Sequence, residues 1–450
     1  MTAQQSALPT MDRQRVFWLW LPLAVSFTLM MLEGPSVQSA IARLGDPETN
    51  LAAFGLVLSL SLIIESPVIM LISTSIALAR DTQSYRALRN FVVALIGGLT
   101  LLTALVAWTP LYDLVVSGLL GIPDTISAAA RPGLRIMLLW TAAIGWRRFY
   151  QGLLVRHGLT QRVSYGTAIR LGSAILTAFV LVRWGAVSGA QVGAYALMVG
   201  VLSEALATYL FAVPLVRRVF TTPGEIAAPP LTWQAIMRFH VPLAATSLLT
   251  LLVQPLTAAA LARLAQPTLT LAAWPVVFTT LLVLRGWGMA LQETTIAQAH
   301  DRRALLPLRD FTVIVAVTTS LATAVIAWTP MLDWYLGRVI GLHPNLHGLV
   351  RYGLQIGTLL PALTALTSWL RGLLVAAQTT KFVYQGMALN LLVNGLALLL
   401  GVWLRLPGIL VAAAALLLAI SMEYLYLQRQ YAKTVRTSTA SVLSSARAVP

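Results

Sequence analysis

The sequence predicts an all-α polytopic membrane protein of twelve transmembrane helices, arranged as two parallel repeats of six. Three observations predict this class. Of the 450 residues, 58% are hydrophobic and only 10% are charged, whereas about a quarter of the residues of a soluble domain are charged. Apolar segments long enough to cross a bilayer recur along the whole chain. Short motifs of the first half return in the second half after a constant offset of 220 residues, as from Ala107 to Ala327.

The apolar segments set the expected helices, because a span needs about 20 apolar residues. We expect spans over 16–42, 51–79, 88–109, 132–155, 163–182, 191–216, 233–262, 270–298, 305–328, 350–375, 381–402 and 408–428. Arg13 and Arg15 precede the first span, which we interpret as an uncleaved helix. Most loop arginines fall on the same side as these two, so the positive-inside rule places both termini in the cytoplasm. We expect a multi-pass protein of the inner (plasma) membrane.

The internal repeat divides the chain into two lobes. Its matching strings are Leu21-Pro22-Leu23-Ala24 with Val241-Pro242-Leu243-Ala244, Ala107-Trp108-Thr109-Pro110 with Ala327-Trp328-Thr329-Pro330, and Gly152-Leu153-Leu154-Val155 with Gly372-Leu373-Leu374-Val375. Late in each half the offset slips by one residue, which brings Glu204 onto Glu423. Both repeats begin in the cytoplasm and are therefore parallel. We predict lobes at 1–218 and 233–432, a cytoplasmic linker at 219–232 and a disordered tail at 433–450.

Glu65 is the first candidate functional residue, because it lies in the middle of the apolar segment 51–79. An ionisable group at the bilayer centre costs at least roughly 2.5–3.5 kcal/mol. The repeat aligns Glu65 with Arg285, and equivalent positions of two lobes face each other across the central axis. The two residues are expected either to pair in one state and separate in another, or to form a permanent pair that lets both helices insert.

Three further residues, Glu33, Glu293 and Arg170, complete the candidate site. Glu33 lies two residues before Pro35, Pro67 follows Glu65, and Pro255 is the repeat partner of Pro35, so we expect kinks at all three prolines. A carboxylate beside a kink fits a proton or sodium site, and the alternative is a Glu33 held by a hydroxyl or an Arg. Glu293 fits a gate or an interfacial residue. Arg170 has the neutral Asn390 as its repeat partner. We interpret Glu204 and Glu423 as structural, with Arg170 or Arg148 as partners.

The sequence gives no support for an enzyme. It contains no G-x-x-x-x-G-K-[ST] motif, no H-E-x-x-H motif and no cysteine. His343 and His347 flank a proline-containing loop, so we expect no metal site. The net charge of +16 comes from arginines in short loops, which set topology, and predicts no nucleic-acid partner. We expect a monomer in the lipid bilayer with a small-molecule substrate, and no cofactor beyond a coupling H⁺ or Na⁺.

The two six-helix repeats with central polar groups resemble the MATE-like (MOP) superfamily of exporters and flippases. The string LEGPSVQSAIARLGDPETNLAAFGLVLSLSLIIESPV and the segment Arg285-Gly286-Trp287 with Gln292-Glu293 look like parts of the progressive-ankylosis (ANKH)-type transporters and their prokaryotic relatives. The resemblance implies export of small organic anions through a central cavity lined by Glu33, Arg285 and Glu293. The long acidic tail of the animal protein is missing here.

These observations predict a secondary-active exporter that works by alternating access of two lobes. Glu33 and Glu65 are the expected carriers of a proton or sodium ion in antiport, and Arg285 is the expected contact for the substrate, a small organic anion or an amphipathic solute. The alternative is a flippase for a lipid-linked saccharide or another lipid-linked precursor. A third class, a receptor or scaffold without transport, would not need opposite charges at the middle of the membrane.

Overall fold

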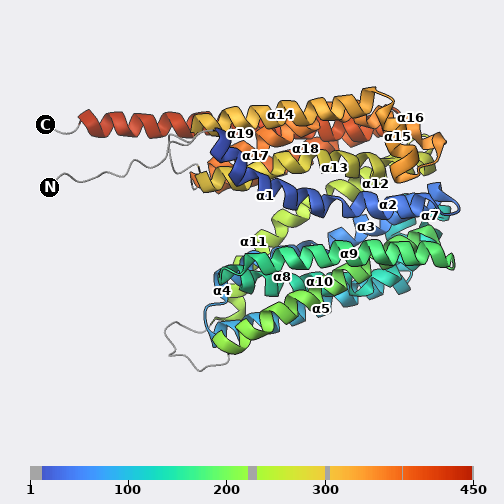
Figure 1. Cartoon of the computed structure of the whole chain (residues 1–450), viewed down its shortest axis with the longest axis horizontal. Helices are drawn as coiled ribbons and strands as arrows, with labels where there is room; N and C mark the ends of the chain where they lie inside the picture. Colours follow the sequence, from blue (N-terminus) through green and yellow to red (C-terminus); the bar gives the residue numbers. More distant parts are fainter. Residues whose placement is uncertain (1–12, 221–230, 299–304, 378, 448–450) are drawn as a thin grey trace.

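Two helical bundles make up the protein (Figure 1). The computed structural model describes residues 13–220, 231–298, 305–377 and 379–447, and this part of the chain contains no strand. The first lobe comprises α1 (Arg13–Met31), α2 (Glu33–Ala42), α3 (Pro47–Ile69), α4 (Leu71–Leu78), α5 (Thr82–Trp108), α6 (Leu111–Asp113), the π-helical η1 (Leu114–Leu119), α7 (Asp124–Ile136), the 3₁₀-helical η2 (Met137–Leu139), α8 (Trp140–Arg156), α9 (Thr160–Trp184) and α10 (Gly189–Val219).

The second lobe repeats this order of elements. It comprises α11 (Trp233–Leu251), α12 (Val253–Ala262), α13 (Pro267–Gln298), α14 (Leu305–Trp328), α15 (Met331–Trp334), the π-helical η4 (Tyr335–Ile340), α16 (Pro344–Ile356), the 3₁₀-helical η5 (Gly357–Leu359), α17 (Leu360–Ala376), α18 (Thr380–Trp403) and α19 (Gly408–Arg447). Even local irregularities recur: Asp46 and Gln266, each just before the proline that starts α3 or α13, have φ of 51° and 54°. The two halves therefore fold in the same way.

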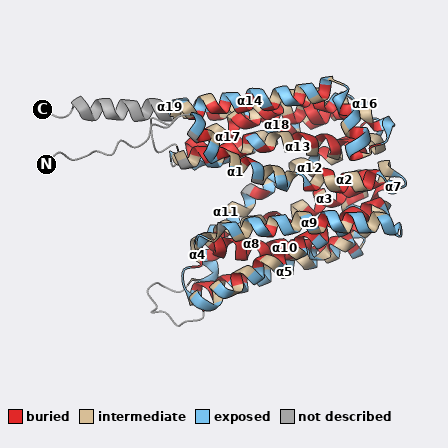
Figure 2. Ribbon diagram, viewed as in Figure 1, coloured by how far each residue is buried: buried red, intermediate tan, exposed pale blue. Residues whose placement is uncertain are grey.

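Eleven helices within the described residues are long and apolar enough to cross a membrane, so the expected count of twelve is not confirmed. The expected span 132–155 is the one missing. It is divided among α7, η2 and α8, and the run carries Arg131, Arg135, Arg147 and Arg148. Exposed residues lie on the outer faces of the bundles (Figure 2), and they include many large apolar side chains such as Leu176, Leu399 and Trp403. Outer faces of this kind suit contact with lipid.

The first span of each lobe is broken in the middle, at Leu32 between α1 and α2 and at Leu252 between α11 and α12. Pro35 and Pro255 each lie three residues after the break. Because proline has no backbone N–H, the carbonyl four residues earlier stays free and the helix bends there. The second span is also interrupted, between α3 and α4 at Met70, three residues after Pro67. All three expected kinks thus lie beside helix interruptions.

The breaks let the two lobes exchange the first half of their first span. α1 packs against α13 and α14 of the second lobe: the Trp20 indole donates to the Trp287 carbonyl at 3.0 Å, and Arg13 pairs with Asp310 at 2.6 Å. α11 packs against α3 and α4 of the first lobe, with the His240 ring 2.9 Å from the Thr74 hydroxyl. α2 and α12 pack within their own lobes, against α10 and α18 respectively.

Two boundaries differ from expectation or lie outside the described residues. The predicted linker 219–232 falls largely outside them, since only 219–220 and 231–232 are described. The predicted disordered tail 433–450 overlaps α19, which continues to Arg447, and its last three residues lie outside the described residues. This stretch contains neither glycine nor proline before Pro450, so nothing in its sequence ends a helix that has already formed.

Candidate functional site

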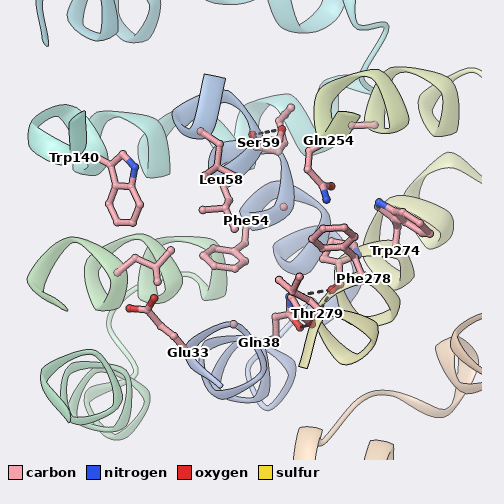
Figure 3. A pocket seen from close by; sticks show the side chains of 18 of the residues that line it. Glu33, Gln38, Phe54, Leu58, Ser59, Trp140, Gln254, Trp274, Phe278 and Thr279 are labelled. Atoms are coloured by element: carbon pink, nitrogen blue, oxygen red, sulfur yellow. Dashed lines mark hydrogen bonds between the residues drawn. The ribbon is translucent and has the colours of Figure 1, made fainter. Parts of the chain in front are cut away.

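A cavity of about 290 Å³ lies beside the break in the first span, between the first lobe and α13. Figure 3 shows Glu33 and Trp140 on one side of it and Phe278, Thr279 and Trp274 on the other. Its charged lining consists of Glu33, Glu65, Arg147, Arg148 and Arg170. Two of these are the carboxylates that the sequence predicts as ion carriers, so the fold brings both to one cavity.

Glu33 and Arg170 form a two-pronged ion pair. Arg170 Nε donates to Glu33 Oε1 at 2.9 Å and Nη2 to Oε2 at 2.6 Å. Glu33 lies in the first turn of α2, where the helix dipole favours a carboxylate. The Arg170 guanidinium also lies over the Trp140 ring, 5.7 Å from its centre. Both residues are candidates from the sequence, but the pair between them is not predicted. They are 137 residues apart, and this spacing does not show that α2 and α9 are in contact.

Glu204 is fully buried behind this pair and forms an ion pair with Arg147. It accepts a hydrogen bond from Arg147 and one from Gln151 at 3.2 Å, and Arg170 Nη1 lies 3.7 Å away. The expected partner Arg170 is therefore present. The other expected partner, Arg148, does not contact Glu204, and its neighbour Arg147 does. Successive residues of a helix are about 100° apart around its axis, so only one of two adjacent side chains on α8 points at α10. Arg170 touches both Glu33 and Glu204.

Glu65 has a different environment from Glu33. It is 5% exposed, and its carboxylate accepts a hydrogen bond from the Trp140 indole. Among the described residues, no cation lies within ion-pair distance of it, although Arg147, Arg148 and Arg170 surround it at longer range. Sequence reasoning missed Trp140. The sequence indicates only that a buried indole N–H usually needs an acceptor, and it does not show that this acceptor is Glu65.

A second cavity of about 500 Å³ lies in the second lobe and is lined by Arg285, Glu293, Arg371, Asn390 and Glu423. Arg371 pairs with the fully buried Glu423, whose second oxygen accepts from Asn390 Nδ2 at 2.9 Å. Arg285 Nε donates to Thr364 Oγ1 at 2.7 Å. Glu293 is exposed, and it makes no ion pair among the described residues.

Glu65 and Arg285 do not meet in this conformation. They line different cavities, which share only the lining residues Leu62, Gln254, Phe278 and Leu282. The interpretation as a permanent pair is therefore wrong for this conformation. Pairing in another state stays a prediction.

The lobes hold each other at one end of the molecule, where α2, α7 and α16 lie (Figure 1). Arg43, which follows α2, donates to the carbonyls of Arg338 and Val339 at 3.0 and 2.8 Å. Arg263, which follows α12, donates to the carbonyl of Leu119 at 2.6 Å. Further towards the centre, Thr279 Oγ1 donates to Gln38 Oε1 at 2.8 Å. The bundles diverge from there towards the end at which α1 begins.

No metal site is evident among the described residues, where no three His, Cys, Asp or Glu side chains gather closely enough to hold an ion. The chemistry available at both cavities is instead that of carboxylates and guanidinium groups in low-polarity surroundings. Such groups bind and release protons, small cations and anions.

Solved structures of MATE transporters match the chain over nearly its whole length. A multidrug resistance MATE family transporter of the MOP superfamily in an inward-facing conformation matches with a TM-score of 0.69 at 16% identity, covering 94% of this chain and 99% of that one. The outward-facing conformation of such a transporter gives 0.62 at 15% identity over 97% and 100%. The lipid II flippase MurJ, in an inward closed conformation, gives 0.70 at 11% identity over 91% and 87%.

The chain is therefore a multi-pass membrane protein with the fold seen in these MATE transporter structures. At the level of sequence, no family profile and no curated protein matches it. The finer resemblance to the progressive-ankylosis-type transporters stays a prediction.

Proposed function

We propose that the protein is a secondary-active exporter of the inner (plasma) membrane that works by alternating access. The observation that carries this proposal is the asymmetry between the two ends. Arg43 and Arg263 tie the lobes together at one end, while both charged cavities lie further towards the other. The higher TM-score to the inward-facing MATE structure than to the outward-facing one supports an inward-facing state.

Coupling to a proton or sodium gradient rests on Glu33 and Glu65. Arg170 lies 2.6 Å from Glu33 and 3.7 Å from Glu204. A proton or a sodium ion on Glu33 weakens its attraction for Arg170, so the guanidinium moves towards Glu204. Because Glu33 begins α2, just after the helix break, loss of this ion pair frees α2 from α9. Ion binding thereby changes how the broken span attaches to its own lobe.

Glu65 is the second expected carrier. Its hydrogen bond comes from the neutral Trp140 and not from an arginine, so protonation or sodium binding does not have to displace a salt-bridge partner. Glu65 and Glu33 share Trp140 and Arg170 as neighbours, since the Arg170 guanidinium lies over the Trp140 ring. We therefore expect the two carboxylates to respond to each other's state of charge.

A flippase for a lipid-linked precursor is the second candidate, and the match to MurJ favours it. The two functions differ in their substrate. A flippase moves a membrane-bound lipid without needing a water-soluble solute, whereas an exporter moves a solute from one aqueous side to the other.

Proteoliposomes with separately imposed pH and sodium gradients test the proposal. Flux is followed for radiolabelled carboxylates and phosphate esters, and lipid translocation for a fluorescent lipid-linked saccharide. We expect one gradient to drive solute flux, and Glu65→Gln and Arg285→Gln each to reduce it about tenfold or more without loss of folded protein. Asp113→Asn, at an exposed pair with Arg131, is the control that keeps flux.

The proposal fails if neither gradient drives flux of any solute or if both cavity variants transport like the parent. Gradient-independent translocation of the lipid alone would favour the flippase.

A further inference from the structure

Arg285 carries a charge that the second lobe does not neutralise. Its side chain is half-buried and lines the second cavity. Of its five N–H donors, the one on Nε is used by Thr364 Oγ1 at 2.7 Å. Within the described residues, Nη1 and Nη2 have no acceptor and no carboxylate within 4.0 Å. Four donors of a guanidinium are thus free to meet a ligand.

Glu423, the buried carboxylate of this cavity, is fully occupied by other partners. Its Oε1 accepts from both Nε and Nη2 of Arg371, the Nε bond being 2.8 Å, and its Oε2 accepts from Asn390. Glu293 lies two turns of α13 further along, about 12 Å for eight residues, and is exposed. Around Arg285 itself, the cavity therefore has one uncompensated positive charge.

A stripe of polar side chains on α17 faces the same cavity. Thr364, Thr367, Ser368 and Arg371 recur at the spacing of one helix face. Thr367 is 2% exposed, and its hydroxyl has no hydrogen-bond partner in the described part of the chain. A buried hydroxyl without a partner is costly, so the Thr367 hydroxyl is available to donate a hydrogen bond to a ligand in this cavity.

We propose that Arg285, with Thr367 and Ser368, binds the carboxylate or phosphate head of an amphipathic organic anion. This inference rests on the proposed function for the statement that the anion is the transported substrate. Guanidinium binds such heads through two parallel N–H donors, and threonine and serine hydroxyls donate to the remaining oxygens.

The rest of the cavity indicates what kind of ligand body would fit beside the anionic head. Its apolar lining includes Phe27, Leu249, Met289, Met387 and Ile420, and methionine adapts to ligands of varied shape. A volume of about 500 Å³ falls in the range of small-molecule sites, about 300–1,000 Å³. A ligand with a charged head at Arg285 and a single apolar chain fits both the polar and the apolar region of the cavity.

The first lobe differs at the equivalent positions, which explains why the anion binds on one side only. The repeat aligns Arg285 with Glu65, and Thr367 and Ser368 with Arg147 and Arg148. Arg147 is already paired with Glu204, and Arg148 has Glu65 among its charged neighbours. Three arginines around the first cavity are thus balanced by the three carboxylates Glu33, Glu65 and Glu204, whereas Arg285 and Arg371 in the second lobe share one buried carboxylate, Glu423.

Thermal unfolding of the whole chain in an uncharged maltoside detergent tests this site without any need for transport. The probes are decanoate, decyl phosphate, decyltrimethylammonium and decanol, which share one chain length and differ in the head. We expect decanoate and decyl phosphate to raise Tm in a saturable manner, and the ammonium and the alcohol to leave it unchanged. The inference is overturned if all four probes act alike or if neither anion acts.

Variants locate the effect. Arg285→Gln is expected to lower the affinity for decanoate and for decyl phosphate about tenfold or more. Arg285→Lys is expected to keep part of this affinity, and Thr367→Val to lower it several-fold. Arg183→Gln, which removes an exposed arginine at the end of α9, is the matched control that retains binding. An undiminished anion shift in Arg285→Gln and Thr367→Val would overturn the assignment.

The source of the anionic head is decided by competition. If phosphatidylglycerol, but not phosphatidylcholine, abolishes the decanoate shift, the head belongs to a membrane lipid. If neither lipid competes, it belongs to a free amphipathic anion. Both results support an anion site. Binding that depends on Arg285 without any gradient-driven flux would sink the exporter proposal alone, and gradient-driven flux without anion binding would sink this inference alone.

Discussion

Arg43 and Arg263 occupy equivalent positions in the two lobes, and each donates hydrogen bonds to backbone carbonyls of the opposite lobe. Arg43 reaches the carbonyls of Arg338, Val339 and Ile340 at the end of η4. Arg263 reaches those of Leu119 and Leu120 at the end of η1. The last carbonyls of a helix have no intrahelical partner and carry partial negative charge. Two such contacts close this end of the molecule symmetrically.

Gly121 and Gly341 make these contacts possible. Both follow the π-helical turns with φ of 70° and 75°, a conformation that glycine adopts without strain. A Cβ on Gly341 would lie 2.9 Å from Arg43 Cγ. The backbone therefore leaves room for the arginine of the other lobe, and the repeat supplies the arrangement twice.

Removal of the two arginines is expected to open this end. In Arg43→Ala/Arg263→Ala, five interlobe hydrogen bonds of about 0.5–1.5 kcal/mol each are lost, so the population of the outward-open state rises. The chain contains no cysteine, so spin labels at Asp124→Cys and Asn345→Cys, both exposed near this end, report the distance between lobes. We expect a longer distance in the double variant.

The matched control is Arg131→Ala, which removes an arginine whose contacts stay within the first lobe. The arginine contacts play no part in closure if the label distances of the double variant equal those of the control.

A second prediction compares the two carboxylates that share Arg170. Glu204→Gln leaves Arg147 buried without its ion pair, at a cost of about 3–5 kcal/mol. Glu33→Gln leaves Arg170 with Glu204 still 3.7 Å away, so its cost is smaller, about 1–3 kcal/mol. Thermal unfolding in detergent is therefore expected to show the larger loss of Tm for Glu204→Gln. The opposite order would contradict a structural role for Glu204.

A third prediction concerns Gly55 on α3, at the centre of the interface. A Cβ at this position would lie 2.7 Å from Pro275 Cγ on α13, so Gly55→Val keeps the lobes apart and favours the outward-open state. The same spin-label pair measures this change. Gly97→Val is the control, because nothing lies within 4 Å of a Cβ there. Equal label distances in both valine variants would show that close approach at Gly55 is not required.

Part of this site is predictable from sequence because it depends on local chemistry. Glu33, Glu65 and Arg285 stand out as charges in apolar segments, and Pro35 and Pro255 mark the broken spans. Trp140 and Arg147 were missed because their roles depend on which face of α8 points to α3 and to α10. The predicted meeting of Glu65 and Arg285 assumed that equivalent positions lie close together across the axis. They do not in this conformation, in which each residue lines its own lobe's cavity.

The sequence by itself determined that the protein is a helical membrane protein, that its halves repeat, and which residues place charge within the bilayer. The hydropathy and the constant offset between the repeats carry that information. Neither depends on how the helices pack, because a charge in lipid is costly in any arrangement of them. Only the tertiary structure decided that α1 and α11 cross to opposite lobes, that Arg170 joins Glu33 to Glu204, and that Arg285 stays without a carboxylate. Ion pairs form over a few ångströms, and residues more than a hundred positions apart come within that range only when the helices have packed.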